Sequence, residues 1–403
     1  MRLEYFSLFL LSRLKSVTRL EGRGLFCVLI WLAVAAEFLI GIAPARAASV
    51  DLRVAIEDGV NQVTVGSSTQ AVVKDGAGRP VGEIGAMNAF VAQSKKSMIA
   101  MDRWQAGQFW IEPTGGGYVF IGDRWYRGRT QLVPNGKGIT AINHVNLEHY
   151  LYSVLGGEMN GNWPQEALKA QAVAARSYAL YQRERAGNRA FDLGDTPAWQ
   201  VYGGIVDESA GTQAAVNATA GQVLTFNGQI IEAVFHSSAG GCTDNVEEVW
   251  VQPLPYLRSV QDYDQGSPVF QWTKTFSRSE LSKLIPGVGN ILALQPEKTT
   301  KCGRIVSAQV IGDAGRRRMN GESLRTALGL RSTLFEVIPQ TGPASTKGKS
   351  QLPTAFHING RGFGHGLGMS QWGAHGLATR GATYQQILGH YYRGTTLAKI
   401  QVK

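Results

Sequence analysis

Glu158 is a carboxylic acid whose sequence neighbours suit proton transfer. It stands in the segment GGEMNGNW, residues 156–163, with Leu155, Met159 and Trp163 close by. Apolar neighbours disfavour the charged form of a carboxyl group and raise its pKa toward values useful for proton donation. A helix N-terminus just downstream would act in the opposite direction, by stabilising the anion. These residue types indicate a general acid, and an ordinary exposed loop glutamate is the alternative.

Arg176 and Tyr178 interrupt an Ala-rich segment whose face is otherwise apolar. A buried arginine needs a carboxylate or a ligand to satisfy its guanidinium. We therefore predict that both residues contact substrate. The alternative is an arginine at the edge of the face that extends into water.

A second group of small polar residues follows a predicted strand, in the stretch FHSSAGGCT, residues 235–243. Ser237, Ser238, Gly240 and Gly241 are candidate substrate contacts. Two ligands, His236 and a cysteine, do not make a zinc site, and no nucleophile-elbow pattern surrounds the serines. The alternative is a tight loop whose hydroxyls and amides satisfy one another.

A third stretch, GRGFGHGLGMSQWG, has glycine at every second position from 360 to 368. Such a backbone can approach a ligand closely, and the stretch lacks the residues of a nucleotide-binding loop. A titratable ring, an amide and a stacking ring in this stretch suit sugar recognition. The candidate substrate contacts here are His365, Gly366, Met369, Ser370, Gln371 and Trp372. The alternative is that the glycines serve tight packing only.

The elements that must position these residues indicate an α+β fold. A β-rich N-terminal region, 48–145, precedes a mixed α/β catalytic core, 146–403, which contains one long Ala-rich helix. We predict helices over 145–155, 164–185, 323–328 and 384–392, and strands over 222–226, 230–236 and 305–311. Ser277 and Glu280 form a predicted capping box, and residues 341–352 a flexible loop. We expect Glu158, Arg176, Ser237, Ser238 and the 365–371 segment to line one cleft, because a single acid needs a groove that positions its substrate.

The N-terminus has the three parts of a secretory signal peptide: a basic start, an apolar run of 12 residues (25–36) and the sequence Ala45-Arg46-Ala47. A membrane-spanning helix needs about 20 apolar residues, so we predict cleavage after Ala47. An uncleaved anchor is the alternative and the one predicted route to a membrane. The protein is therefore expected in the periplasm or cell wall.

Charge and cysteines fit an exported protein. Removing residues 1–47 takes away six basic and three acidic residues and lowers the net charge from +10 to +7. A basic surplus suits an anionic wall polymer, and no long basic block or zinc-finger spacing favours nucleic acid. Two cysteines remain, Cys242 and Cys302, and an oxidising compartment favours a disulfide between them. Two unpaired thiols are the alternative.

Three long stretches together resemble the stage II sporulation protein D family, which also includes amidase enhancers. They are LEHYLYSVLGGEMNGNWPQEALKAQAVAARSYAL; FHSSAGGCTDNVEEVW, preceded by QVYGG at 200–204; and GRGFGHGLGMSQWGAHGLATRGATYQQILGHYY. The resemblance implies a lytic transglycosylase that acts on peptidoglycan strands stripped of stem peptides. It places the family's catalytic glutamate on Glu158 and its helix arginine on Arg176. Gln200 and Tyr202, in the QVYGG segment, complete the candidate substrate contacts.

The resemblance also bears on cofactors and partners. Some members bind zinc through cysteines just before the QVYGG segment, but Gly194 and Trp199 stand where those cysteines would be. We predict no metal and no cofactor. A hydrolase would need a second acid, for which Asp244, Glu247 and Glu248 are available. The rival functions are a non-catalytic wall-binding module that stimulates an N-acetylmuramoyl-L-alanine amidase, and a zinc amidase.

Overall fold

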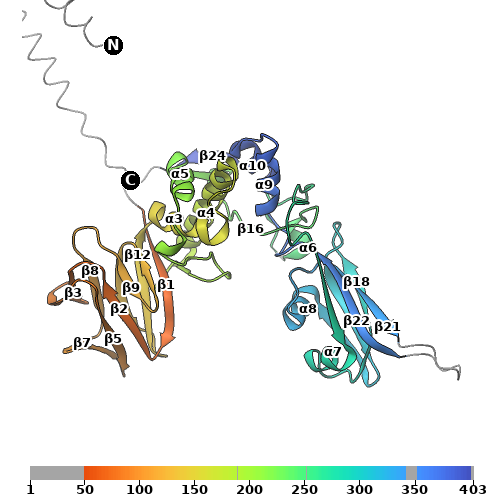
Figure 1. Cartoon of the computed structure of the whole chain (residues 1–403), viewed down its shortest axis with the longest axis horizontal. Helices are drawn as coiled ribbons and strands as arrows, with labels where there is room; N and C mark the ends of the chain where they lie inside the picture. The colour runs from red at the N-terminus through yellow and green to blue at the C-terminus, as the bar shows by residue number, and fades with distance from the viewer. Residues whose placement is uncertain (1–49, 188, 251, 342–351, 401–403) are drawn as a thin grey trace, which may run out of the picture. The chain divides into compact units, whose positions relative to one another are not determined.

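The computed structural model describes residues 50–400, apart from 188, 251 and 342–351. The predicted signal peptide, 1–47, and nearly all of the predicted loop 341–352 lie outside these residues. The fold is α+β, as predicted: antiparallel sheets come first, and helices with further strands follow (Figure 1). No helix in the described part of the chain has the length and apolarity to cross a membrane.

Two sheets are built mainly from the first strands, and their pairings are antiparallel except that of β13 with β1. These are β1 (Asp51–Val60), β2 (Gln62–Ser67), β3 (Ala71–Asp75), β4 (Pro80–Ile84), β5 (Asn88–Lys95), β6 (Met98–Met101), β7 (Trp104–Ala106), β8 (Phe109–Pro113), β9 (Val119–Ile121), β10 (Arg124–Tyr126), β11 (Arg129–Pro134), β12 (Ile139–Asn146) and the later β13 (Leu193–Gly194). The strand orders are β13-β1-β12-β11-β8-β3-β4 and β10-β9-β2-β5-β6-β7. Phe109 and Ile111 of β8 are fully buried and Trp110 between them is not, as expected for a strand with one face toward the core.

Helices pack against these sheets and share their apolar core. They are α3 (Leu147–Glu158), α4 (Gln165–Arg185), η1 (Ile205–Asp207), α5 (Ala210–Ala218), α6 (Val246–Val249), α9 (Gln371–Thr379) and α10 (Tyr384–Tyr391). Four short strands accompany them: β14 (Gln222–Phe226), β15 (Gln229–Ile230), β16 (Phe235–His236) and β24 (Thr396–Lys399). Small alanine side chains on α4 are fully buried and let α3, α5, α9 and α10 approach it closely.

Residues 271–361 form a unit with its own apolar core. It contains β17 (Gln271–Ser277), α7 (Arg278–Leu284), β18 (Ile291–Thr299), β19 (Ile305–Gly312), β20 (Gly315–Asn320), α8 (Gly321–Leu328), β21 (Phe335–Thr341) and β22 (Pro353–Arg361). Its sheets have the orders β17-β22-β21 and β18-β19-β20. We call the apolar core that the N-terminal sheets share with the helices the first core. We call residues 271–361 the inserted unit, because the chain leaves the first core before this segment and returns to it afterwards.

One parallel strand pair brings the distant sequence motifs together. Phe235 of β16 pairs with Met369, in β23 (Met369–Ser370), although the inserted unit lies between them in sequence. The pairing places the start of α9 next to the loop after β16. The fold therefore puts the second and third predicted motifs side by side.

Local predictions succeeded where capping residues mark an end. The capping box at Ser277 opens α7, and Gly329 ends α8 with a φ of 56°. Helix α3 differs from its prediction, since it starts at Leu147 and continues through Gly156 and Gly157 to Glu158. The predicted strand 230–236 is interrupted between β15 and β16, and α9 was not predicted.

Candidate functional site

Glu158 is the last residue of α3. Asn146 caps the start of the helix, where its side-chain oxygen accepts hydrogen bonds from the Glu148 and His149 amides. At the other end, Gly156 lies against η1 so closely that a Cβ would come within 1.8 Å of the Asp207 carbonyl oxygen. Glycine is thus required for α3 to end against η1, and this contact fixes where Glu158 emerges.

Both carboxylate oxygens of Glu158 accept hydrogen bonds. The Val201 amide donates to Oε1 over 3.0 Å, and the Gln371 side-chain amide donates to Oε2 over 3.0 Å. Burial raises the pKa of Glu158 above its ordinary value of 4.5, and the two hydrogen bonds partly oppose the rise. Because Glu158 ends α3, the negative end of the helix dipole also disfavours its anion. The half-buried side chain is thus suited to hold, release and regain a proton.

Gln371 reaches Glu158 because of how α9 begins. Ser370 is fully buried and caps α9, with its hydroxyl accepting from the Gly373 amide at 3.1 Å. Gln371 is the first helical residue, and only 5% of it is exposed. The start of α9 therefore fixes the direction of the Gln371 amide toward Glu158.

Three half-buried rings cluster around the start of α4 and α9. The Trp163 ring lies 4.7 Å from the Trp372 ring and 4.8 Å from the His375 ring, measured between centroids. The Trp372 amide donates to the Ser237 carbonyl at 3.0 Å, which joins the cluster to the loop after β16. Trp372 directly follows Gln371, the donor to Glu158, so these half-buried rings offer an aromatic surface at the start of α9.

Arg176 requires a correction. It is fully buried, and its guanidinium donates to both oxygens of Glu148, at 2.9 and 2.6 Å, and to the Gln222 carbonyl. Glu148 also accepts a hydrogen bond from the Gly221 amide. Because its donors are occupied inside the protein, Arg176 ties α3 to α4 and β14 instead of facing a substrate.

Gln200 and Tyr202 require the same correction. Gln200 is fully buried, accepts from the Tyr150 hydroxyl and donates to the Ala175 carbonyl. Tyr202 is 1% exposed, and its hydroxyl donates to Asn143. The backbone of Val201, between them, is the part of this segment that contacts Glu158.

The loop after β16 is organised around Asp264. The Ser238 hydroxyl donates to this carboxylate at 2.5 Å, and the Gly240 and Gly241 amides donate to it at 2.7 and 3.1 Å. Ser238 and Gly240 are buried, so the predicted substrate contacts of these residues are replaced by an internal network. Ser237 and Gly241 are the half-buried members of the group, and the Ser237 carbonyl accepts a hydrogen bond from the Trp372 amide.

His365 does not reach Glu158 with either ring nitrogen. Its Nε2 donates to the Phe235 carbonyl, and its Nδ1 accepts from the Leu367 amide, both at 3.0 Å. Burial lowers the pKa of His365 to about 4, so the ring stays neutral. It lines a cavity of about 240 Å³ with Arg304, on which Gly366 packs so tightly that a Cβ would meet the guanidinium at 2.1 Å.

The remaining predicted contacts divide between core and surface. Met369 is fully buried in β23, and this is at odds with substrate contact. Tyr178 is half-buried, with its ring 6.5 Å from that of Phe235. Of the residues predicted to line one cleft, Gln371 bonds to Glu158, and Ser237 contacts Trp372, the residue after Gln371. The polar groups of Arg176, Ser238 and His365 have their partners elsewhere.

A disulfide joins Cys242 to Cys302. It links the loop after β16 to the loop between β18 and β19, and therefore ties the first core to the inserted unit. Among the residues that the structure describes, no group of three His, Cys, Asp or Glu side chains is arranged to hold a metal ion.

Some site residues were absent from the sequence prediction. The Val201 amide carries no side-chain signal, because any residue offers a backbone N–H. His375 stands one helical turn after Gln371, and the i, i+4 spacing in QWGAH could have placed it on the same side of a helix.

Comparisons with known proteins support this reading of the motifs. A family described as "Stage II sporulation protein" matches residues 135–226, and a "Domain of unknown function (DUF8618)" matches 254–368. The chain is 34% identical over 284 residues to stage II sporulation protein D of Bacillus subtilis, which covers 64% of this chain and 76% of that protein. It is 33% identical over 257 residues to an uncharacterized protein of Brachyspira hyodysenteriae, covering 64% of this chain and 67% of that one. The amidase enhancer of Bacillus subtilis is 33% identical over 290 residues, but the match spans only 40% of its length and 61% of this chain.

Proposed function

The chain belongs to the stage II sporulation protein D family, and we propose that it is a lytic transglycosylase that cleaves denuded peptidoglycan strands with Glu158 as its acid and base. The observation that carries the proposal is the environment of Glu158. It is a half-buried carboxyl group with a raised pKa and two hydrogen-bond donors. One donor, Gln371, is followed by Trp372, whose ring packs against that of Trp163. A raised pKa lets the group keep its proton to higher pH than an ordinary glutamate does, as a general acid requires.

The reaction needs only one carboxyl group. Protonated Glu158 gives its proton to the glycosidic oxygen as the bond from that oxygen to the anomeric carbon breaks. The acetamido group of the muramic acid stabilises the positive centre that forms. The 6-hydroxyl of the same sugar then attacks the anomeric carbon and gives its proton to the Glu158 carboxylate. An anhydro sugar end results, no water is consumed, and Glu158 returns to its starting state.

Val201 and Gln371 would act on the second half of this cycle. Their N–H groups stabilise the anion that exists after Glu158 has given up its proton. They also fix the direction of the carboxylate, so that the acid and base steps use one geometry. Trp163 and Trp372 would hold the sugar rings in register by stacking.

The carboxylates considered for hydrolysis are engaged elsewhere. Asp244 is fully buried and lies 3.0 Å from the Arg304 guanidinium, and Glu247 pairs with Arg258. Glu248 accepts a hydrogen bond from the Lys301 amide. None of these contacts leads to Glu158, which favours the mechanism without a second acid.

The decisive experiment replaces Glu158 with glutamine, which keeps the shape and removes the titrating proton. Its amide oxygen can still accept from the Val201 N–H, and Gln371 must turn its own amide over to accept from the new NH2 group. We expect Glu158→Gln to lose about 100- to 10,000-fold in the rate at which anhydro ends appear on purified denuded strands, measured by mass spectrometry. Glu247→Gln, which makes the same chemical change at an exposed ion pair, should keep full activity. Cleavage by Glu158→Gln at the wild-type rate would refute the proposal.

The similarity to an amidase enhancer motivates a second candidate function, a wall-binding module that stimulates an amidase without cleaving glycan. The same variant separates the two. A non-catalytic enhancer would stimulate a cell-wall amidase equally well with Glu158→Gln, and neither protein would release anhydro ends. A transglycosylase would release them only with Glu158 intact.

A further inference from the structure

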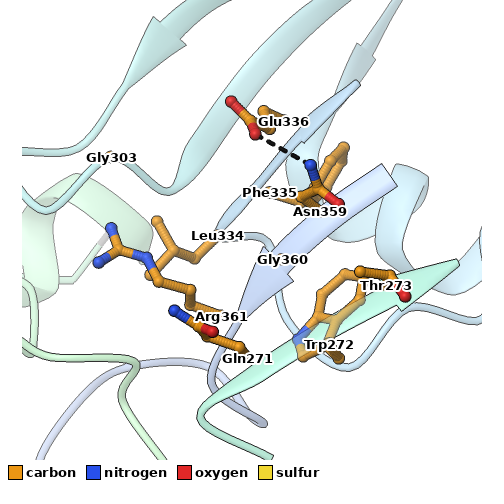
Figure 2. A pocket seen from close by; sticks show the side chains of 10 residues that line it. All are labelled: Gln271, Trp272, Thr273, Gly303, Leu334, Phe335, Glu336, Asn359, Gly360 and Arg361. Carbon is orange, nitrogen blue, oxygen red and sulfur yellow. Dashed lines mark hydrogen bonds between the residues drawn. The ribbon is translucent and has the colours of Figure 1, made fainter. Parts of the chain in front are cut away.

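A second site candidate lies in the inserted unit, at the end of the sheet formed by β17, β22 and β21. A cavity of about 510 Å³ opens there, within the range of about 300–1,000 Å³ that is common for small-ligand sites. Figure 2 shows Arg361 and Gln271 at one end of it, and at the other end Glu336 hydrogen-bonded to Asn359. No residue proposed for the chemistry at Glu158 lines this cavity.

Strand alternation gives this sheet two different faces. Residues directly opposite one another share a face. Gln271 lies opposite Arg361, and Thr273 lies opposite Asn359. The neighbouring positions Phe335, Ile358 and Phe356 are buried in the unit's own core, with which α7 and α8 pack. The face that bears Gln271, Thr273, Asn359 and Arg361 is thus left with hydrogen-bonding groups and no apolar cover.

Arg361 is the unusual member of this face. Its side chain is exposed, and within the described residues its guanidinium makes no hydrogen bond or ion pair. Arg304 pairs with Asp244 and Arg318 with Glu297, whereas Arg316 has no carboxylate partner among the described residues. Arg361 differs from Arg316 because it lines a cavity. Glu336, the carboxylate of the cavity, bonds to Asn359 and not to Arg361. The cavity therefore offers the N–H donors of the Arg361 guanidinium, whose planar geometry suits a planar anion such as a carboxylate.

The cavity and Glu158 lie at the two ends of one seam between chain segments. Near the cavity, a Cβ on Gly240 would come within 2.9 Å of the Arg361 Cβ, so the two segments touch there. Ser238 then bridges to Phe363, and Phe235 pairs with Met369. The same segment ends at Gln371, which bonds to Glu158. The two sites are thus connected through the fold, by contacts whose members Ser238 and Met369 are buried.

We propose that this cavity binds a saccharide unit that carries a carboxylate, with Arg361 pairing to that carboxylate through two N–H groups. Gln271, Thr273 and Asn359 would bond the hydroxyl and amide groups of the sugar, and Leu334 would contact its apolar face. The proposal rests on the proposed function for its ligand: muramic acid units without stem peptides carry free lactyl carboxylates. The inserted unit would then hold a distant part of the strand that Glu158 cleaves.

The test measures binding to denuded strands in the Glu158→Gln background, so that the ligand stays intact. Arg361→Ala should weaken binding about tenfold, the loss expected for a charge-assisted contact in an open site. Strands whose carboxylates have been reduced to alcohols should bind the Glu158→Gln protein with Arg361 intact about as weakly as native strands bind Arg361→Ala. Arg361→Ala should then be insensitive to the reduction, because the contact is already missing.

Arg316→Ala is the matched control, because it removes the same charge from an exposed position of β20 outside the cavity. It should leave binding unchanged. Equal losses for the two variants would show general attraction by charge and overturn the site. Wild-type binding by Arg361→Ala, or an equal loss on native and reduced strands, would also overturn it.

A kinetic measurement with otherwise unsubstituted protein keeps this proposal separate from the proposed function. Arg361→Ala should raise KM for long strands and leave kcat, and it should leave short oligosaccharides that cannot reach the cavity unaffected. If Arg361→Ala behaves as wild type while Glu158→Gln is inactive, the cavity proposal fails and the proposed function stands. If neither the wild type nor Glu158→Gln cleaves the strands, the proposed function fails, and the binding experiment still decides on the cavity.

Discussion

The first core and the inserted unit handle polar groups in opposite ways. In the first core, polar side chains are buried and paired: Arg176 binds Glu148, and Glu158 is held by Val201 and Gln371. In the inserted unit, one sheet face is covered and the other presents exposed donors around a cavity, with Arg361 as the clearest case. Burial is what shifts a carboxyl pKa, whereas exposure leaves groups available to a ligand. The contrast assigns chemistry to the first core and binding to the inserted unit.

Opening the Cys242–Cys302 disulfide should have the largest effect, because this bond connects the two regions. Its residues are 60 apart in sequence, and closing a loop of that size stabilises a fold by up to about 4 kcal/mol in the chain-entropy model. We expect the Cys242→Ser/Cys302→Ser variant to lose stability on that scale. Calorimetry should resolve separate transitions for the first core and the inserted unit.

The reduced wild-type protein is the control for the substitutions themselves and should melt like the double variant. An unfolding midpoint unchanged from the oxidised protein, with one transition, would show that the apolar contacts between the regions are sufficient. The first core and the inserted unit would then behave as one cooperative unit and not as two regions.

Much of the fold was predictable because its signals are local. The capping box at Ser277, the terminal Gly329 and the Ala-rich pattern of α4 each predicted an element that the structure contains. The end of α3 was missed because Gly156 and Gly157 favour a loop by propensity alone. The close approach of η1 reverses that preference, and it is a tertiary contact that no local pattern reveals.

Removing the Gln371 side-chain amide tests the first core at its centre. In Gln371→Leu, Glu158 loses a hydrogen bond that lowers its pKa, so that pKa should rise further. The general acid then stays protonated to higher pH, and the alkaline limb of the pH–rate profile should move upward. We also expect kcat to fall about tenfold, because the base step loses a stabilised anion.

If Gln371 had only a structural role, Gln371→Leu would lower the rate without moving the alkaline limb of the pH–rate profile. That result would contradict the role of Gln371 in setting the pKa of Glu158. Gln386→Leu, at the cap of α10, is a suitable control, since it removes a glutamine that bonds to Thr383 and not to Glu158. Its profile should keep the wild-type alkaline limb.

The site was predictable in its residue types and less so in their roles. Glu158, Gln371 and Trp372 were selected by chemistry, and the structure brings them together. Arg176, Gln200 and Tyr202 were selected by the same reasoning, yet each has its partner inside the protein. A buried polar residue needs a partner, but sequence alone does not say whether that partner is substrate or protein. The cavity at Arg361 escaped prediction because cross-strand pairing, and no contiguous motif, assembles it.

The smallest expected effect is on stability, and it has a definite sign. The folded-state pKa of Glu158 is raised, so the folded protein binds this proton more tightly than the unfolded chain does. Its contribution to stability is complete below the ordinary pKa of 4.5 and is lost as pH rises through the raised value. Glutamine cannot ionise and avoids that loss.

Glu158→Gln should therefore have a higher melting temperature than the wild type at pH 7, and the difference should shrink toward pH 4. Glu247→Gln should show no gain at pH 7, because its exposed ion pair holds the pKa of Glu247 low. A Glu158→Gln variant that melts at or below the wild-type temperature at pH 7 would mean that the two donors to Glu158 outweigh its burial. Burial in the first core would then not govern the proton affinity of Glu158, and the contrast with the exposed groups of the inserted unit would fail at that residue.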